Sequence, residues 1–336
     1  HLTMSDVEFS ISFAGPLVTF QDIGRPGNMR YGVSASGPMD IVSFEAANAV
    51  LGNETKQTAI EISLGGLILQ CHEGSITLAI TGGDFLIEYQ GQKISSWTVL
   101  TIQKGERLSV RAGKSGSWAY LAFSGKLNVK DWLNSSSTHS TSGFGGGVLK
   151  TGQKFTLTDA SNQANRIGPI LKPNFNTNDL IHAVLGPQDQ YFMNTAIKIF
   201  SNSIFKVSDN YDRMGMQLTG PKLELKSALS IPSEPVVKGS IQVSGDGIPT
   251  ILLADHQTTG GYPKIATVIS SDINRLVQLR SNQNVEFIII NSNEALQKTR
   301  KFLDMKEKYL QKISTSRGTL EQRLMSENLI GGVEFN

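Results

Sequence analysis

The sequence predicts a mostly β protein built from barrels or sandwiches. Short apolar runs, bounded by Gly, Pro, Asn and Asp, recur along the whole chain. Glycine accounts for 33 of 336 residues, more than the usual share of about 7%, and this indicates many tight turns. Few long segments show a helical spacing of apolar residues, which argues against a doubly wound sheet.

Length, charge and cysteine content limit the function classes. A chain of 336 residues is long enough for about two domains with a buried core. The net charge of +2 gives no strong field that would attract nucleic acid or an acidic membrane. No run of about 18 apolar residues occurs, so no membrane span is predicted. The single cysteine, Cys71, excludes an internal disulfide framework and is expected to be a core or strand residue.

Two groups of strands are predicted, separated by a polar stretch with two prolines at 160–177. The first group lies at 7–13, 67–70, 76–80, 85–89, 99–102, 108–110 and 118–123. The second lies at 182–185, 205–207, 239–243, 251–254, 266–269 and 285–290. We therefore predict a β-rich domain over 1–165, a second β domain over 175–292, and a C-terminal helix and tail over 293–336.

Four helices are predicted. The first covers 41–51, with Asp40 as its N-cap and Gly52 and Asn53 as its stop. The second covers 188–200, and the third covers 272–279 with Asp272 as its cap. The fourth, at 294–313, is long and charged and is expected to pack on the outside of the second domain.

The two ends of the chain carry little pattern. His1 to Thr3 are expected to precede a native start at Met4, and no secretion signal is expected, because no basic region followed by an apolar one is present there. The tail from about Ser314 is expected to be loose or to contact a partner.

Common catalytic motifs are not found. "RAGKSGS" at 111–117 resembles a phosphate-binding loop but has Leu108 where its first glycine should stand, so it is predicted to be a turn. There is no GxGxxG entering a helix, no HExxH and no GxSxG. The histidines have no metal-ligand spacing, so no metal site is predicted; they are His1, His72, His139, His182 and His256.

The segment "FQDIGRPGNMRYGVSASGPMD" at 20–40 is predicted to be a shaped functional loop. Strands do not tolerate so many glycines, and shaped loops on rigid barrels are where function concentrates. Its polar side chains are Asp22, Arg25, Arg30, Ser34, Ser36 and Asp40. In the alternative interpretation, Asp22 and Arg25 brace the interior and Asp40 only caps the following helix.

Two other loops are candidates. "NSSSTHSTSGFGGG" at 134–147 is expected to be a mobile loop or, alternatively, an anion-binding or lid loop, because glycine lets backbone N–H groups converge on a ligand. "SDNYDRMGMQLTGP" at 208–221 places Asp212 and Arg213 before a turn. Such a pair can orient a carboxylate or carbamate substrate, or can be a surface brace.

The densest polar group lies at 231–264 and comprises Glu234, Gln242, Asp255, Gln257, Tyr262 and Lys264. If 239–243 and 251–255 pair as a hairpin, Gln242 and Asp255 could converge on one face. Lys264, near an acid and beside an apolar strand, could be a base or an electrostatic stabiliser. In the alternative interpretation, Gly260 and Gly261 only make the turn and Lys264 is solvated.

A family resemblance rests on many separate blocks over about residues 8–290. They are "QDIGRPGNMRYGVSASGPMD", "AANAVLGN", "EISLGG", "LAITGGD", "SGFGGG", "DRMGMQLTGP", "EPVVKGSIQV" and "ILLADHQTTGGYPKIATV", in this order. They resemble the biotin-dependent carboxyltransferase / allophanate hydrolase subunit 2 family. This family includes the C subunits of 5-oxoprolinases, the antagonist of the sporulation-kinase inhibitor, and part of the carboxyltransferase domain of urea carboxylase.

The resemblance implies two barrel-like domains related to the cyclophilin fold, with the cyclophilin-like barrel over 175–292. It implies a cytoplasmic protein, the C subunit of an ATP-dependent 5-oxoprolinase, which opens 5-oxoproline to L-glutamate together with an A subunit and a B subunit of the allophanate hydrolase subunit 1 type. ATP and Mg²⁺ would act at the level of that complex. Two alternatives stay open: a carboxyltransferase subunit acting on urea or a similar small amide with biotin on a separate carrier, and a non-catalytic regulator that binds the B-type subunit.

On this resemblance the segment 251–270 is expected to form the rim or floor of the active cleft; otherwise it is a structural hairpin. The catalytic candidates are Asp255, Lys264 and Gln257, and the substrate-binding candidates are Arg213, Asp212, Glu234, Gln242, Tyr262, Arg25, Ser36 and Asp40. The chain departs from the family where "GFGGG" passes directly to Val148, without the Gly-Arg that members often carry. It also contains no biotin-attachment "AMKM" and no ATP-grasp domain.

Overall fold

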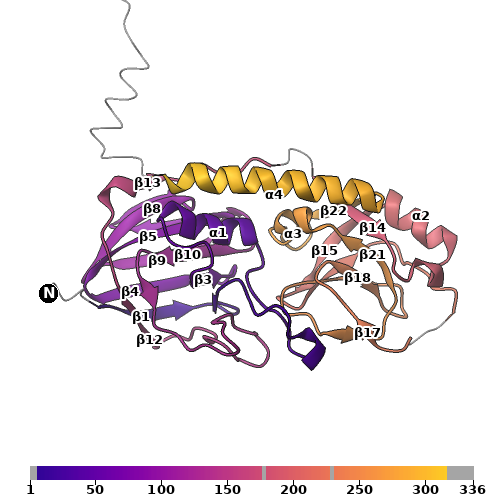
Figure 1. The fold of residues 1–336 in the computed structure, drawn as a ribbon, viewed down its shortest axis with the longest axis horizontal. Coiled ribbons are helices and arrows are strands. Elements are labelled where there is room, and N and C mark those ends of the chain that lie inside the picture. Colours follow the sequence, from indigo (N-terminus) through magenta and orange to yellow (C-terminus); the bar gives the residue numbers. More distant parts are fainter. Residues whose placement is uncertain (1–5, 176–178, 228–230, 316–336) are drawn as a thin grey trace, which may run out of the picture.

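The computed structural model describes residues 6–175, 179–227 and 231–315. Within these residues the protein is mostly β, as predicted, with two sheets on one side, a closed barrel on the other and one long helix lying along both (Figure 1). The expectations about the native start and the tail beyond residue 315 lie outside the described residues. No helix in the described part of the chain is long and apolar enough to cross a membrane.

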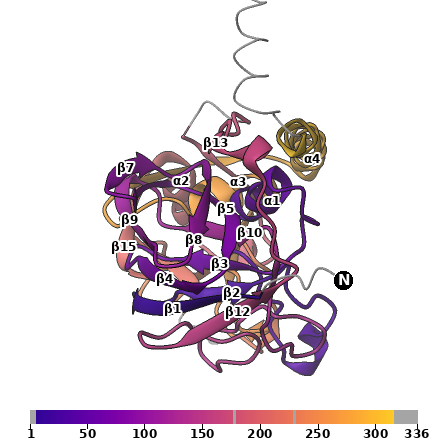
Figure 2. The same cartoon turned by 90° about the vertical axis from the view of Figure 1, so that its left-hand side faces the viewer.

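The N-terminal strands form two sheets with a shared apolar core (Figure 2). One sheet has the order β11-β12-β1-β4-β9-β6-β7 and the other the order β13-β8-β5-β10-β3-β2. The strands are β1 (Val7–Ala14), β2 (Thr19–Gln21), β3 (Ala59–Ile62), β4 (Leu67–Glu73), β5 (Ser75–Thr81), β6 (Asp84–Tyr89), β7 (Gln92–Ser95), β8 (Thr98–Gln103), β9 (Arg107–Ser115), β10 (Ala119–Phe123), β11 (Lys126–Leu127), β12 (Lys154–Thr158) and β13 (Gly168–Pro169).

Aromatic side chains join these two sheets. The ring of Phe9 on β1 lies 5.6 Å from that of Phe123 on β10 and 5.3 Å from that of Phe155 on β12. Offset and tilted aromatic pairs at this spacing add to the stabilisation from area burial. Cys71 is buried in the same core, as predicted, and burial raises the pKa of its thiol to about 11, so it is not a reactive thiolate.

The strands of the second half close a barrel in the order β14-β21-β18-β19-β16-β15-β22. They are β14 (Ile181–Leu185), β15 (Ile204–Tyr211), β16 (Gly215–Thr219), β18 (Ser240–Val243), β19 (Pro249–Leu252), β21 (Lys264–Val268) and β22 (Asn284–Ile289). A separate two-stranded sheet pairs β17 (Glu234–Pro235) with β20 (Thr259–Gly260). We call the segments that carry it, residues 231–237 and 258–262, the flap.

Two helices agree with the prediction: α1 has the predicted cap, and α4 has nearly the predicted span. Helix α1 (Ile41–Val50) begins after Asp40, whose carboxylate accepts a hydrogen bond from the Ser43 N–H at 3.0 Å. Helix α4 (Ser292–Ser314) begins with a capping box formed by Asn291 and Glu294.

Two other helices differ from the prediction. The segment expected as one helix over 188–200 contains a short 3₁₀ turn, Asp189–Tyr191, before α2 (Asn194–Asn202) begins. The Gln188 N–H donates to the carbonyl of Lys264 on the neighbouring strand β21 at 3.1 Å, and this bond holds Gln188 out of a helical conformation. Helix α3 (Ser270–Leu276) starts before Asp272, which therefore is not its cap; its carboxylate instead accepts hydrogen bonds from the N–H and ring of His182, both at 2.7 Å.

Helix α4 packs on both halves of the molecule and not only on the second (Figures 1 and 2). Lys306 forms a largely buried ion pair with Glu45 of α1, with 2.5 Å between Nζ and Oε2. Tyr309 donates a hydrogen bond to the Leu171 carbonyl at 2.7 Å. The helix thus ties the N-terminal sheets to the barrel on the side opposite the loops described next.

Candidate active site

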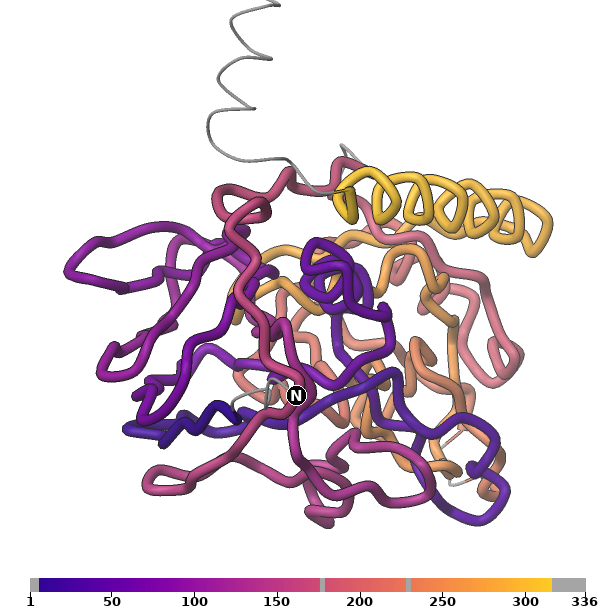
Figure 3. Tube along the Cα trace, turned by 60° about the vertical axis from the view of Figure 1, so that its left-hand side comes forward, coloured from indigo at the N-terminus to yellow at the C-terminus, as the bar shows by residue number. Residues whose placement is uncertain are grey.

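Loops from the two halves of the chain meet beside the mouth of the barrel (Figure 3). The loop after β2 reaches the barrel, where the Ser34 hydroxyl donates to the Ala254 carbonyl at 3.2 Å. The loop around 134–147 approaches the same barrel segment, because Ser140 bonds to Asp255. Residues far apart in the sequence therefore share one site.

A fully buried arginine lies at the centre of this junction. The Nε and Nη2 groups of Arg213 donate to both carboxylate oxygens of Asp255, each at 3.0 Å. Its Nη1 donates to Glu61 on β3, and Nη2 also donates to the Gly37 carbonyl at 2.7 Å. Burial alone would lower the pKa of Arg213, but the two carboxylates outweigh it and raise that pKa above its usual value. The arginine is thus a permanently charged brace across the junction.

Asp255 is as fully buried as Arg213, and its carboxylate also accepts several hydrogen bonds. Besides Arg213, its Oδ2 accepts the N–H of Ser140 at 2.9 Å and the hydroxyl of Ser140 at 2.7 Å. Burial would raise the pKa of Asp255, but Arg213 and Ser140 lower it to about 2. An ionised carboxylate held by four hydrogen bonds is an anchor for the site, and its catalytic role stays a prediction.

A second layer surrounds this ion pair. Glu61 accepts hydrogen bonds from the Met39 N–H and the Tyr120 hydroxyl, each at 2.8 Å. The ammonium of Lys238 reaches the carbonyls of Pro38 and Met39 at 3.2 and 3.3 Å, and burial lowers its pKa to about 8. Sequence reasoning missed Glu61, Lys238 and Ser140, because no local motif marks partners so distant along the chain.

A cavity of about 640 Å³ opens above Asp255 at this junction. Its walls come from both halves of the protein: Gly32, Val33, Ser34, Trp132, His139, Thr141, Ser142, Phe144, Met214, Asp255, His256, Gln257, Thr258 and Thr259. The rings of Trp132 and Phe144 stack with centroids 4.6 Å apart, so one wall is aromatic. A cavity of this size suits a small molecule, and two of its lining side chains are histidines.

These two histidines present opposite hydrogen-bonding faces. The Nδ1 of His256 lies 2.6 Å from the Gln257 carbonyl, which can only accept, so Nδ1 carries the proton and Nε2 carries the lone pair. The Nδ1 of His139 accepts the Ser142 N–H at 3.2 Å, so in the neutral ring Nε2 carries the proton. Burial lowers the pKa of His256, which favours its neutral form.

Neither histidine was among the predicted site residues, because only metal-ligand spacing was considered. The sequence around each histidine could have indicated a site, because each lies in a turn rich in Ser, Thr and Gly: "STHSTSGFGGG" and "ADHQTTGG". Gln257 was predicted and does line the cavity beside His256.

The predicted residues of the 20–40 loop serve as internal supports. Arg25 is buried, donates to the carbonyls of Trp132 and Ser137, and lies 5.0 Å from the Trp132 ring. Asp22 does not pair with Arg25 but accepts hydrogen bonds from the Ser135 hydroxyl at 2.6 Å and the Ser136 N–H at 2.9 Å. The 134–147 loop is therefore anchored at Asp22 and Asp255, and its mobility stays a prediction.

Ser36 and Asp40 are also placed away from the cavity wall. Ser36 has a positive φ of 54°, and its buried hydroxyl has no hydrogen-bond partner within the described ranges. Asp40 caps α1 and also accepts a hydrogen bond from the Gln278 amide at 2.9 Å. The structure therefore shows Asp40 as a helix cap, which was the alternative interpretation of this residue.

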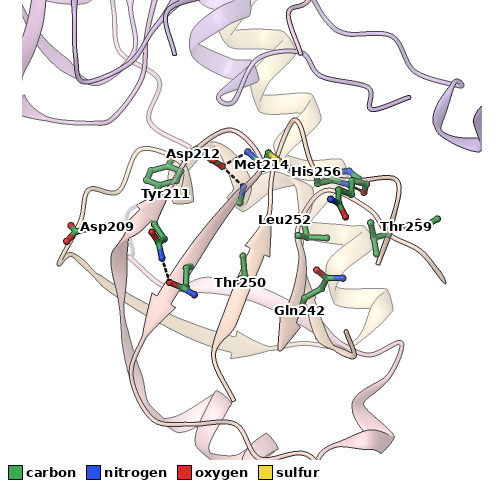
Figure 4. A pocket seen from close by; sticks show the side chains of 14 residues that line it. Asp209, Tyr211, Asp212, Met214, Gln242, Thr250, Leu252, His256 and Thr259 are labelled. Atoms are coloured by element: carbon green, nitrogen blue, oxygen red, sulfur yellow. Dashed lines mark hydrogen bonds between the residues drawn. The ribbon is translucent and has the colours of Figure 1, made fainter. Parts of the chain in front are cut away.

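A second groove of about 540 Å³ adjoins the cavity on the outer face of the barrel (Figure 4). It is lined by Asp209, Asn210, Tyr211, Asp212, Met214, Gly215, Gln217, Val236, Gln242, Thr250, Leu252, His256, Gln257 and Thr259. Gln242 lines this groove and Asp255 lines the cavity, so their predicted convergence is not seen. Asp212 accepts the N–H groups of Met214 and Gly215, at 2.7 and 3.1 Å, and so shapes a turn apart from Arg213.

The remaining predicted residues gather around the flap. Lys264 is only 1% exposed, so the alternative interpretation as a solvated lysine is wrong. Gln188 accepts the Lys264 N–H at 3.0 Å and donates to Glu234 at 2.6 Å. Tyr262 is half exposed on the flap, and neither it nor Glu234 nor Lys264 lines the cavity or the groove.

Comparisons with known proteins agree with this architecture. Residues 31–289 match the family model described as carboxyltransferase domain, subdomain A and B. The chain is 33% identical over 286 residues to the 5-oxoprolinase C subunit of Haemophilus influenzae, covering 84% of this chain and 91% of that protein. It is 31% identical over 289 residues to the 5-oxoprolinase C subunit of Escherichia coli, with the same coverage.

A solved structure shows the same fold within a much larger chain. The K. lactis urea amidolyase superposes with a TM-score of 0.80 at 28% identity, covering 90% of this chain and 20% of that chain. Because the family model spans most of the chain and the two 5-oxoprolinase relatives align along nearly their whole length, this protein belongs to the carboxyltransferase family that combines subdomains A and B.

Proposed function

We propose that this chain is the C subunit of an ATP-dependent 5-oxoprolinase and opens 5-oxoproline to L-glutamate together with an A and a B subunit. Two relatives that carry this name align with the chain over 91% of their length. The observation that carries the proposal is the histidine pair, because one cavity offers a hydrogen-bond acceptor on His256 and a donor on His139.

This pair complements an amide. A lactam presents one N–H donor and one C=O acceptor, and the two groups need opposite partners. In the proposed complex, Nε2 of His256 accepts the lactam N–H and Nε2–H of His139 donates to the carbonyl oxygen. The stacked rings of Trp132 and Phe144 then cover the apolar part of the five-membered ring.

The neutral His256 can also act on a proton. With Nδ1–H fixed on the Gln257 carbonyl, Nε2 has a single lone pair, so at the attack step the attacking water replaces the lactam N–H on Nε2 and gives up its proton there. Arg213 and Asp255 beneath it hold the loop that carries His256 in place. In this proposal Asp255 positions the base and Gln257 orients it.

ATP and Mg²⁺ belong to the proposal only at the level of the complex. Over the described ranges, no group of three or more His, Cys, Asp or Glu side chains is arranged to hold a metal ion. No step through ATP is assigned to the described residues.

A reconstitution assay tests the proposal. The chain is mixed with its A and B subunits, 5-oxoproline, ATP and Mg²⁺, and glutamate release is measured with each component omitted in turn. We expect glutamate only from the full mixture. A stable complex that releases no glutamate under these conditions would overturn the oxoprolinase assignment and favour the regulator that binds the B-type subunit without catalysis.

Substitution of the histidines tests the site within the same assay. His256→Gln should lower the rate by about 10²–10⁴-fold, the usual contribution of a general base. The matched control is His72→Gln, because the His72 side chain is exposed and its hydrogen bond is to Ser10. Equal rates for the wild type and His256→Gln would remove His256 from the mechanism.

A second candidate is a carboxyltransferase subunit that acts on urea or a similar small amide. The observation that favours it is the similarity to the urea amidolyase of Saccharomyces cerevisiae, at 31% identity over 305 residues, although this covers only 16% of that enzyme. Urea also has an N–H donor and a C=O acceptor, so the histidine pair does not separate the two. Turnover that requires bicarbonate and a biotinylated carrier protein would establish this alternative.

A further inference from the structure

We propose that Lys264 and Gln188 form a binding site for a small carboxylate ligand, and that the flap covers this site with its own carboxylate, Glu234. The site differs from the histidine cavity, since neither Lys264 nor Glu234 lines that cavity. The proposal does not depend on the oxoprolinase activity. It rests on a buried charge that the described part of the chain leaves without a partner.

Lys264 is a buried lysine on a barrel strand whose ammonium lacks a hydrogen-bond partner within the described ranges. It is 1% exposed, and its Nζ has no hydrogen-bond partner among the described residues. An ammonium has three donors, and leaving all of them unpaired in the interior destabilises the folded state. Lys238, which is also withdrawn from water, avoids this cost by bonding to two carbonyls. A partner that arrives from outside the described structure would remove the cost at Lys264.

Glu234 indicates which chemistry that partner has. It is the acidic group whose charge acts on Lys264, yet its carboxylate bonds to the Gln188 amide at 2.6 Å and not to the ammonium. The same Gln188 accepts the backbone N–H of Lys264 at 3.0 Å, so one amide side chain is bonded both to the lysine backbone and to Glu234. A ligand carboxylate that displaced Glu234 would gain the Gln188 donor together with the Lys264 ammonium.

Few backbone hydrogen bonds hold the flap. It is held by the two-residue pairing of β17 with β20 and by single backbone bonds such as Val236 N–H to Thr258 O at 3.1 Å. Glu234 and Pro235 are exposed on its outer side. Two groove residues, Val236 and Thr259, belong to the flap, and a third, Gln242, pairs in register with Lys264. The groove in Figure 4 therefore leads to the edge of the proposed site.

Chemical labelling of the full-length chain tests this proposal. Reductive methylation with formaldehyde and dimethylamine–borane introduces no carboxylate, and mass spectrometry measures the rate at Lys264. We expect Glu234→Gln to raise that rate about fivefold, because the flap loses a hydrogen bond to a charged group. Acetate, glutarate and 5-oxoproline should each lower the rate, whereas the neutral lactam 2-pyrrolidinone should not.

Lys238 is the control within the same experiment, since its ammonium is bonded to carbonyls and should not respond to carboxylates. In parallel, carboxylates should raise the melting temperature of the wild type and of Glu234→Gln more than that of Lys264→Met, with affinity at least about tenfold weaker in Lys264→Met. The proposal is overturned if carboxylates fail to protect Lys264 in Glu234→Gln, or if they shift all three melting temperatures equally. Protection by 5-oxoproline alone would identify the substrate as the source of the carboxylate; protection by all three acids would define a general carboxylate site.

Discussion

Two buried cations in the second half of the chain have opposite environments. Arg213 donates to two carboxylates and a carbonyl, and these partners come from both halves of the molecule. Lys264 is buried to the same degree, but its ammonium has no partner within the described ranges. Removing a fully paired buried charge leaves its partners buried without compensation, so such a charge acts as a brace. A buried ammonium without a partner does not brace the fold and is open to a ligand. The comparison therefore separates a brace from a proposed binding site.

The largest expected effect breaks the brace. Arg213→Met leaves Glu61 and Asp255 buried without their cation, which should lower the free energy of unfolding by about 3–5 kcal/mol. Urea denaturation followed by fluorescence measures this change. The matched control is Arg30→Met, since Arg30 lies on an exposed turn over the Tyr31 ring and should change stability by less than about 0.5 kcal/mol. Similar values for both variants would show that the network does not stabilise the junction.

Acid should weaken the same brace. The folded pKa of Asp255, about 2, lies below the usual value of 3.8, so its contribution is fully present above about pH 4 and is lost as the pH falls through about 2. A shift of this size corresponds to about 2 kcal/mol. We expect the stability difference between the wild type and Asp255→Asn to shrink by that amount between pH 5 and pH 2, measured by urea denaturation at each pH. A difference that stays constant over this range would contradict the lowered pKa.

A substitution with a smaller expected effect tests how the 134–147 loop is anchored. Ser140→Ala removes one hydroxyl bond to the Asp255 carboxylate but keeps the backbone N–H bond, so it should cost about 1 kcal/mol. Ser142→Ala on the same loop is the control, because its hydroxyl bonds only to exposed groups of that loop. Thermal unfolding compares the two variants. Equal melting temperatures would mean that the Ser140 hydroxyl does not contribute to anchoring the loop at Asp255.

The smallest effect has the opposite sign and concerns Lys264. Lys264→Met replaces an unpaired buried ammonium by an apolar side chain of similar length, so the protein should gain up to about 1 kcal/mol at pH 7. Burial lowers the folded pKa of Lys264, so the unfolded chain binds more protons, and the wild type should approach the variant in stability as the pH rises towards 10.5. Urea denaturation at pH 7 and at about pH 9.5, still below that usual value, measures both stabilities. A loss of stability as large as that of Arg213→Met would show that Lys264 is a brace as well.

Much of the fold could be predicted because it depends on local patterns. The buried positions of β1 alternate with less buried ones from Val7 to Ile11, so its strand period can be read directly. Helix α1 has a capping aspartate before it and a glycine stop after it, and both signals lie within one turn of its ends. The helix over 188–200 could not be predicted correctly, since Gln188 is held by Lys264 from a distant strand.

The sequence by itself determined the mostly β class, most of the closed barrel's strands, the cap of α1 and the long last helix, because short-range periodicity and turn residues specify these elements. It also identified Gln257 and Asp255 as neighbours in one polar turn. Only the tertiary structure decided which side chains meet: Arg213 and Glu61 are 152 positions apart, and Asp255 and Ser140 are 115 apart. The position of His139 and His256 in the wall of one cavity and the burial of Lys264 arise in the same way, since they depend on how separate loops pack and not on any local pattern.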